Sequence, residues 1–158
     1  MAEPIEFLTL RNLRDALNAI SVAGGYYFDV AKAAVKLDPS ASVEDVIGPD
    51  GPRPYLLIEM KPEAFDYRPS FQLRMTLPFT VHWVGESVGS DDESWMRTFY
   101  QACADIEKAV TVDITRGGRT EDTRIRQRTF DAMFGNQVWV MVDLDMALNR
   151  VYGAPNAA

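Results

Sequence analysis

Histidine and cysteine, two residue types often used in acid–base and nucleophilic catalysis, occur once each in this sequence, as His82 and Cys103. Nucleophilic catalysis needs a hydroxyl or thiol beside a base that a third group orients, and no such pattern surrounds either residue. One cysteine and one histidine are also too few for a Cys- or His-rich metal site. The glycine pairs at 24–25 and 117–118 lack the spacing of a dinucleotide fingerprint or a P-loop. We therefore predict a protein that is not an enzyme and has no metal or cofactor, with His82 at a surface or interface and Cys103 as a buried, inert thiol.

A second group of candidates is a cluster of arginines within TRGGRTEDTRIRQRTF, residues 115–130. Its members are Arg116, Arg119, Arg124, Arg126 and Arg128. They could grip nucleic acid, clamp an anion, or belong to a folded hairpin. The segment 111–158 contains six basic and six acidic residues, whereas the whole chain carries a net charge of −7. A sequence-independent DNA-binding protein is expected to show excess positive charge on one surface, so this local neutrality disfavours DNA binding.

The spacing around these arginines predicts a charged hairpin face. Residues 120–131 and 136–148 both alternate between apolar and polar side chains, with a turn near 134–136. If Ile125 shares a buried face with the valines of the second strand, facing residues must have an odd sum near 269 or 271. Arg126 then faces Asp143 or Asp145, and Arg124 or Arg128 takes the other aspartate.

Two interpretations of this face stay open. Exposed cross-strand ion pairs contribute only ~0.2–1 kcal/mol each, so the pairs can be purely local. Alternatively, the face contacts another subunit, where Arg and Asp at fixed spacing give directional pairing. Arg116 and Arg119 precede the hairpin on a glycine turn and are either an exposed polar turn or a contact to a partner subunit or a phosphate backbone.

The elements that must position these residues follow from hydrophobic periodicity. We expect helices at 5–21 and 91–110, strands at 26–37, 54–60, 71–84, 120–131 and 136–148, and loops at 38–53 and 61–70. The element order α-β-β-β-α-β-β predicts an α+β fold in a single domain, residues 1–158, with a mainly antiparallel sheet of about five strands and two helices packed on one face. No apolar run is long enough to span a membrane, and the mixed charges of the N-terminus argue against a secretion signal.

The segment 71–84, FQLRMTLPFTVHWV, is the clearest pattern, because apolar residues occupy every odd position. Such alternation is typical of a long strand with one buried face. Pro78 falls on the opposite face and lacks an N–H, so the strand is expected at a sheet edge or bulged at this point.

The loop at 38–53 exceeds ordinary connector length, which is usual for functional loops. Apolar and aromatic side chains stand out among the polar residues of the two predicted loops, and they are the candidates for docking a partner: Val43, Val46, Ile47, Phe65 and Tyr67.

Taken in order, several segments resemble the tail-terminator, or tail-completion, proteins of long-tailed bacteriophages. They are LRDALNAI, GGYYFDVAKAAV, RPYLLIEM, FQLRMTLPFTVHWVG, WMRTFYQACADIEKAV and the C-terminal IRQRTF…NQVWVMVDLDMALNRVYG. The resemblance covers residues 5–152 and rests on element order, strand patterning and the aromatic Tyr152 at the end of the last strand.

The resemblance implies a structural virion protein, assembled in the host cytoplasm and located at the head-proximal end of the tail. Six copies usually form a ring that caps the tail tube, stops its polymerisation and docks the head. The implied partners are other copies of the chain, the tail tube protein and a neck or connector protein, with DNA passing through the channel without specific binding.

Two alternatives remain. A phage neck or head-completion protein also forms rings of small α+β subunits. A small dimeric ligand-binding or regulatory domain belongs to a different class, and a pocket with convergent polar groups or stabilisation by a ligand would favour it.

Overall fold

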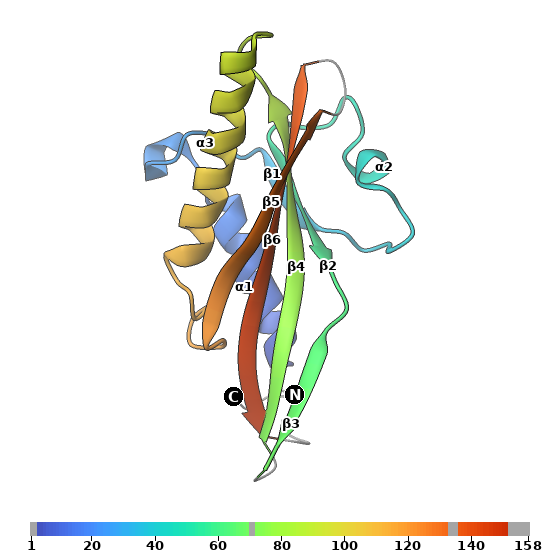
Figure 1. The fold of residues 1–158 in the computed structure, drawn as a ribbon, viewed down its shortest axis with the longest axis vertical. Helices are drawn as coiled ribbons and strands as arrows, with labels where there is room; N and C mark the ends of the chain where they lie inside the picture. Colours follow the sequence, from blue (N-terminus) through green and yellow to red (C-terminus); the bar gives the residue numbers. More distant parts are fainter. Residues whose placement is uncertain (1–2, 70–71, 133–135, 152–158) are drawn as a thin grey trace.

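A computed structural model describes residues 3–69, 72–132 and 136–151 of the chain (Figure 1). It confirms an α+β fold built on one mixed, mostly antiparallel sheet of six strands with three α-helices. The elements are α1 Ile5–Asn18, a 3₁₀ turn Val22–Gly24, β1 Lys32–Val35, α2 Val43–Ile47, β2 Tyr55–Met60, β3 Ala64–Arg68, β4 Gln72–Glu86, α3 Asp92–Thr111, β5 Asp122–Ala132 and β6 Gln137–Val151.

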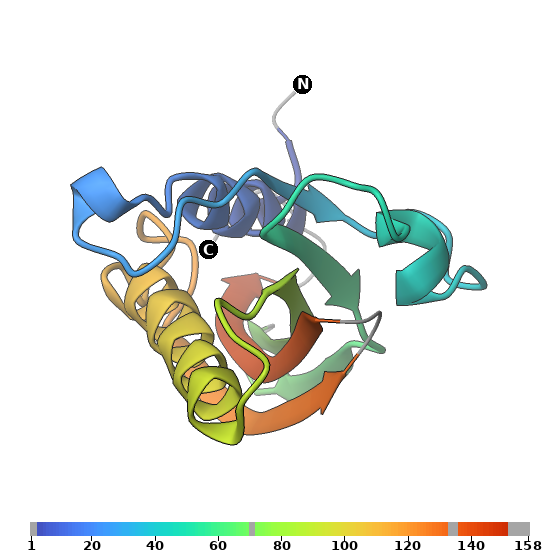
Figure 2. The ribbon, with the colours of Figure 1, turned by 90° about the horizontal axis from the view of Figure 1, so that it is seen from above.

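The strand order across the sheet is β1-β2-β4-β6-β5, and β3 also pairs with β4. The β1–β2 pair is parallel and all other pairs are antiparallel. Seen from above in Figure 2, α1 and α3 lie on one side of the sheet and α2 lies on the other. The predicted pair of helices on one face is therefore present, and a short third helix covers part of the opposite face.

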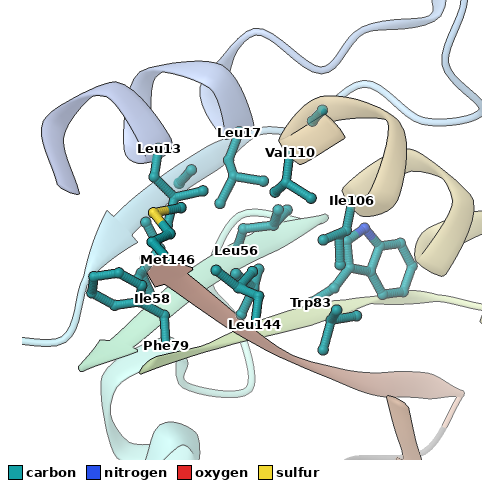
Figure 3. Packing of buried hydrophobic residues seen from close by; sticks show 14 of the residues in the cluster. Leu13, Leu17, Leu56, Ile58, Phe79, Trp83, Ile106, Val110, Leu144 and Met146 are labelled. Atoms are coloured by element: carbon teal, nitrogen blue, oxygen red, sulfur yellow. The ribbon is translucent and has the colours of Figure 1, made fainter. Parts of the chain in front are cut away.

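The main core lies between the sheet and the helices α1 and α3 (Figure 3). Odd residues of β4 and even residues of β6 point to this side, where Trp83 and Leu144 are fully buried. Leu13 and Leu17 of α1 and Ile106 of α3 complete the packing with no exposed surface. The alternation in the sequence therefore identifies the buried face of the long strand correctly.

The prediction for Pro78 was wrong, because β4 is a central strand and is continuous through this residue. β2 pairs with β4 residues 79–84 and β3 pairs with residues 72–76, so Pro78 lies where one neighbour ends and the next begins. Its carbonyl accepts a hydrogen bond from the Lys61 N–H. An N–H at residue 78 would point to this same side of β4, toward β2 and β3 and away from β6. The proline therefore removes no hydrogen bond between β4 and β6.

Three loop and strand predictions also need correction. The predicted strand at 26–37 is regular only over Lys32–Val35, because the buried Asp105 carboxylate accepts hydrogen bonds from the backbone N–H groups of Tyr27 and Phe28 and holds that stretch against α3. The predicted loop at 38–53 contains α2, which Ser42 caps by accepting from the Asp45 N–H at 3.0 Å. The predicted loop at 61–70 contains β3.

The free edge of β1 is closed from within the chain. The Asn18 side chain donates from Nδ2 to the Ala33 carbonyl at 3.0 Å and accepts from the Ala33 N–H at 2.8 Å. The amide at the end of α1 therefore takes the place of a neighbouring strand and satisfies an otherwise exposed backbone edge.

Candidate interaction surface on the open face of the sheet

The side of the sheet opposite α1 and α3, called the open face below, carries the charged hairpin residues predicted from the sequence. Its upper end is covered by α2, where Val43 and Ile47 pack with Leu57 and Val84. Below α2 the face is polar, with side chains from β2, β4, β6 and β5. Its charged and hydroxyl members include Glu59, Thr80, Arg74, Asp122, Arg124, Arg126, Asp143 and Asp145.

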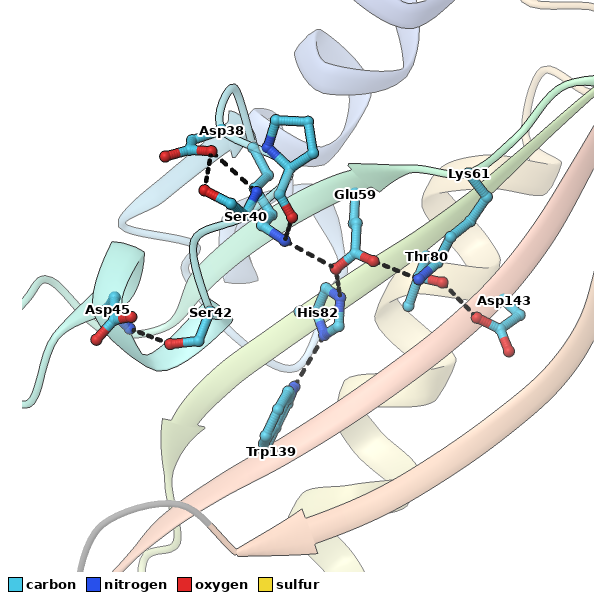
Figure 4. A network of polar contacts seen from close by, with 12 residues as sticks. Asp38, Ser40, Ser42, Asp45, Glu59, Lys61, Thr80, His82, Trp139 and Asp143 are labelled. Atoms are coloured by element: carbon cyan, nitrogen blue, oxygen red, sulfur yellow. Dashed lines mark hydrogen bonds and ion pairs between the residues drawn. The ribbon is translucent and has the colours of Figure 1, made fainter.

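A chain of polar contacts links three strands at the top of this surface (Figure 4). Trp139 Nε1 lies 3.1 Å from His82 Nδ1, and His82 Nε2 lies 3.2 Å from Glu59 Oε2. Because an indole nitrogen can only donate, His82 Nδ1 is the acceptor and Nε2 carries the proton that is donated to Glu59. The expectation of a surface histidine was wrong, since His82 is only 5% exposed.

The titration of this group follows from its surroundings. Burial lowers the pKa of His82, and the nearby charge of Glu59 opposes that effect without overcoming it. For Glu59, burial raises the pKa, but the hydrogen bond and charge of Lys61 and the charge of Lys36 lower it by more, so the net direction is down. The ion pair of Glu59 with Lys36 measures 3.7 Å. A neutral histidine with a charged glutamate is therefore the stable arrangement at neutral pH.

Beside this network, the open face is hollowed by a depression of about 270 Å³ over β4, β6 and β5. Thr80 and Asp143 line it and Thr80 donates to Asp143 Oδ1 at 2.5 Å, and Lys61 and Arg126 also belong to the lining. The predicted pairing of Asp143 with an arginine was wrong, because the threonine on the neighbouring strand β4 takes its place.

A β-bulge at Arg126 decides how the hairpin arginines are distributed. The facing pairs Arg124↔Asp145 and Ile125↔Leu144 have the predicted sum of 269, but Gln127↔Asp143 has a sum of 270. One extra residue therefore reverses which residues face the core. Arg126 still forms an ion pair with Asp145 at 3.4 Å.

Beyond the bulge, Arg128 faces the helices and not the aspartates, and it pairs with Glu107 of α3. Phe130 faces the same way and contacts Phe99 of α3 with a ring-centroid distance of 5.0 Å. The prediction that Arg124, Arg126 and Arg128 share one face was therefore wrong for Arg128. Arg124 itself pairs with Asp122, two residues before it on the same strand.

Arg116 does not reach outward from an exposed turn, as one interpretation expected. It is 1% exposed and adopts a φ of 49°, and its guanidinium donates to the carbonyl of Val110 in the last turn of α3 and to that of Asp113 just after the helix. It therefore caps the helix by satisfying carbonyls that have no partner within it. Arg119 is half-buried and donates to the Arg116 carbonyl at 2.8 Å, so both arginines stabilise the turn.

The candidate docking residues fall into two groups. Val43 and Ile47 are buried on the inner side of α2, where they pack against the sheet, so they cannot dock a partner. Val46 on the outer side of α2 is 38% exposed, and Phe65 and Tyr67 on β3 are 48% and 69% exposed.

Cys103 is buried in α3, and burial raises the pKa of its thiol to about 11. Within the described residues there is no group of three or more His, Cys, Asp or Glu side chains that could hold a metal ion. No helix in the described part of the chain has the length and apolar character needed to cross a membrane.

Sequence reasoning missed the roles of Thr80, Glu59 and Lys61. The alternation of β4 places Thr80 and His82 on one face, but their partners depend on which strands lie beside β4. That neighbourhood is set by β2 and β6, which are separated from β4 and from each other in the sequence.

Comparison with known proteins gives no family for this chain. No family model matches it, and no curated protein matches it at a significant level.

Proposed function

We propose that this chain is a subunit of a ring that caps the tail tube of a long-tailed bacteriophage, ends tube polymerisation and provides the interface for the head or neck. The proposal starts from the resemblance in element order, strand patterning and hairpin sequence. In this proposal the protein is a non-enzymatic part of the virion, with tail tube and neck proteins as its partners.

The observation that carries the proposal is that two strands on opposite sides of the sheet, β3 and β5, each have a strand neighbour on one side only among the described residues. In the part of the chain that the structure describes, β3 pairs only with β4 and β5 pairs only with β6. Two different edges on opposite sides of a subunit favour head-to-tail contacts, and head-to-tail contacts make closed rings when the rotation between copies closes.

The open face fits the wall of a channel through which DNA passes without specific binding. Its charges are largely paired with each other, as in Arg126–Asp145 and Arg124–Asp122. Basic groups already matched to acids release few counterions from a passing phosphate backbone, so they hold DNA weakly.

The test combines particle mass with imaging. Purified protein is examined by light scattering and negative-stain electron microscopy across a concentration series, alone and with tubes assembled from the cognate tail tube protein. Rings with an open centre, and tubes that stop growing when the protein is added, are the expected result. Protein that remains monomeric with and without tubes and leaves tube length unchanged contradicts the proposal.

The depression of about 270 Å³ is the observation that favours the alternative of a small dimeric ligand-binding domain, because polar side chains line it, among them Lys61, Thr80, Arg126, Asp143 and Asp145. A stable dimer that never forms rings and whose melting temperature rises with small anionic metabolites would support that alternative.

A further inference from the structure

The proposed ring needs a specific contact between neighbouring copies. The strands β1 and β3 lie on the same side of the sheet, and they differ in whether their outer backbone groups already have partners. On the side of β1 and β3, Asn18 closes the β1 edge at Ala33. β1 ends at Val35, so the position beside β3 is not filled by β1. All five residues of β3 are exposed.

The direction of the backbone groups can be worked out from the alternation of the ladders. The Pro78 carbonyl accepts from Lys61, so even residues of β4 direct their N–H and C=O groups toward β2 and β3. Phe65 faces the odd residue Met75 and therefore directs its own groups to the free side of β3. On the other edge, the Ala147 carbonyl accepts from Glu121, and the same alternation directs the backbone of Ile125 away from β6.

We propose that β5 of one copy pairs antiparallel with β3 of the next copy, with Asp122 facing Arg68, Arg124 facing Asp66 and Ile125 facing Phe65. This inference rests on the proposed function and names the partner, a second copy, and the register of the contact. It uses Asp122–Arg126, the part of β5 up to the bulge, against the five residues of β3.

Charge and hydrophobicity both favour this register. Asp66 and Arg68 pair with each other on the open face of β3, and Asp122 and Arg124 do so on β5. When the strands are antiparallel in this register, each acid faces a base of the other copy. On the helix side, the same register places the exposed Phe65 ring against Ile125, which is only partly buried.

The register also agrees with the backbone. Phe65 and Ile125, both of which direct their N–H and C=O groups outward, become a directly hydrogen-bonded pair. A shift of one residue would bring an outward-pointing residue against an inward-pointing one and would mix the two faces.

The geometry of ring closure follows from the register. Within one copy, Asp122, Ala147, Thr76 and Ala64 lie in one row across β5, β6, β4 and β3. In the proposed contact Asp122 meets Arg68 of the next copy, which is displaced from Ala64 by 68 − 64 = 4 residues. Four residues span roughly 13 Å along a strand and four strands span roughly 19 Å across the sheet, so the strands tilt by about 35°. This value lies at the lower end of the ~35–45° typical of closed sheets.

Disulfide trapping tests the register directly. Asp66→Cys and Arg124→Cys are introduced together, because facing residues of a non-hydrogen-bonded pair are close enough to form a disulfide. The native Cys103 is buried and does not compete. The matched control combines Asp66→Cys with Asp122→Cys, which is displaced by two residues on the same edge of β5.

The expected result is that mild oxidation links Asp66→Cys/Arg124→Cys copies into a ladder up to the size of the ring, while the control stays largely unlinked. Rings that form without this ladder, or with equal linking in the control, overturn the register and leave the proposed function standing. Linked open chains that never close support the strand contact and overturn the ring. Absence of both rings and linking overturns both.

A second variant separates the contact from folding. Phe65→Pro removes an outward N–H and no ladder bond to β4, so the melting temperature of the subunit should be close to that of the wild type while ring formation is lost. The control Phe65→Val keeps the N–H and should still form rings. Rings of unchanged stability from Phe65→Pro overturn the proposed pairing.

Discussion

The only histidine of the chain makes stability depend on pH in a window where no other side chain ordinarily titrates. His82 accepts from Trp139 through Nδ1, so a proton added to Nδ1 would bring two N–H donors together and break that bond. Burial lowers the pKa of the folded histidine below its ordinary value of 6.5. The unfolded chain therefore binds a proton before the folded chain does, and stability is lost as pH falls through 6.5.

The size of the effect has an upper bound set by linkage. One proton taken up by the unfolded chain alone costs about 1.4 kcal/mol of unfolding free energy per pH unit well below the unfolded pKa. Between pH 7 and pH 5.5 the loss is therefore at most about 1.3 kcal/mol, because titration is only partial near pH 6.5.

The assay is urea denaturation at half-unit pH steps, comparing the wild type with His82→Gln. The variant removes the titrating group and leaves the Trp139 N–H without its acceptor, so it should lose about 1–3 kcal/mol at pH 7. Its free energy of unfolding should then lack the fall between pH 7 and 5.5 that His82 causes in the wild type. Glu59 also has a lowered pKa, but its contribution falls below this window.

Two results would refute the reasoning. Burial raises the pKa of Asp105 and of Glu63, and both carboxyls affect the wild type and His82→Gln alike. A stability advantage of the wild type over His82→Gln that grows as pH falls from 7 to 5.5 would therefore show that the folded histidine binds protons more tightly than the unfolded one. An identical slope in His82→Gln would show that another group is responsible. Lys61→Met provides a further check, because removing a nearby cation should bring the pKa of His82 closer to 6.5 and flatten the wild-type slope.

Three other substitutions or reagents test the core. Asp105→Asn should lose about 1.5–3 kcal/mol of unfolding free energy, since the carboxylate accepts from the N–H groups of Tyr27 and Phe28; unchanged urea midpoints would contradict this role. Gly85→Ala should lose about 1–3 kcal/mol, because a Cβ would lie 2.3 Å from the buried Trp83 ring, and a wild-type melting curve would show that the ring moves aside easily. Cys103 should react with a thiol-exchange reagent at pH 8 only as fast as the protein unfolds, because a pKa of about 11 leaves about a thousandth of the thiol ionised; rapid labelling of the native protein is the opposing outcome.

Much of the fold was predictable because its longest elements have a regular period. Apolar residues at every second position of β4 and β6 identify the buried face, and a spacing of three and four identifies α1. These patterns are local, so they do not depend on knowing which strands are neighbours.

The errors concern residues whose roles depend on distant partners. Arg124, Arg126 and Arg128 alternate without interruption in the sequence, but the bulge at Arg126 moves Arg128 to the face of α3. The spacing of residues in the sequence does not indicate the bulge. The bulge is recognised only from the pairing of β5 with β6, where the register shifts by one residue.

The second kind of error was to expect a charged side chain, Arg116, to be exposed when it is buried. The glycine turn around Arg116 resembles an exposed loop, yet the side chain folds back onto the carbonyls that end α3. The sequence signal was the basic residue just beyond a helix terminus, which is a common way of satisfying the last carbonyls. The charged hairpin face was thus predicted for Arg124, Arg126 and Asp145 and wrongly extended to Arg128. Arg116 was wrongly expected to be exposed on the turn before the hairpin.

The contact between Asn18 and Ala33 also determines the direction in which an assembly can grow. With β1 closed by an amide of its own chain, a copy has β3 to receive a neighbour and β5 to offer to the next one. Two such copies cannot satisfy each other symmetrically through these edges, so each addition leaves one receiving end and one offering end. In the proposed ring, growth therefore ends when the last copy meets the first, and the number of subunits is set by the curvature of a single repeated contact.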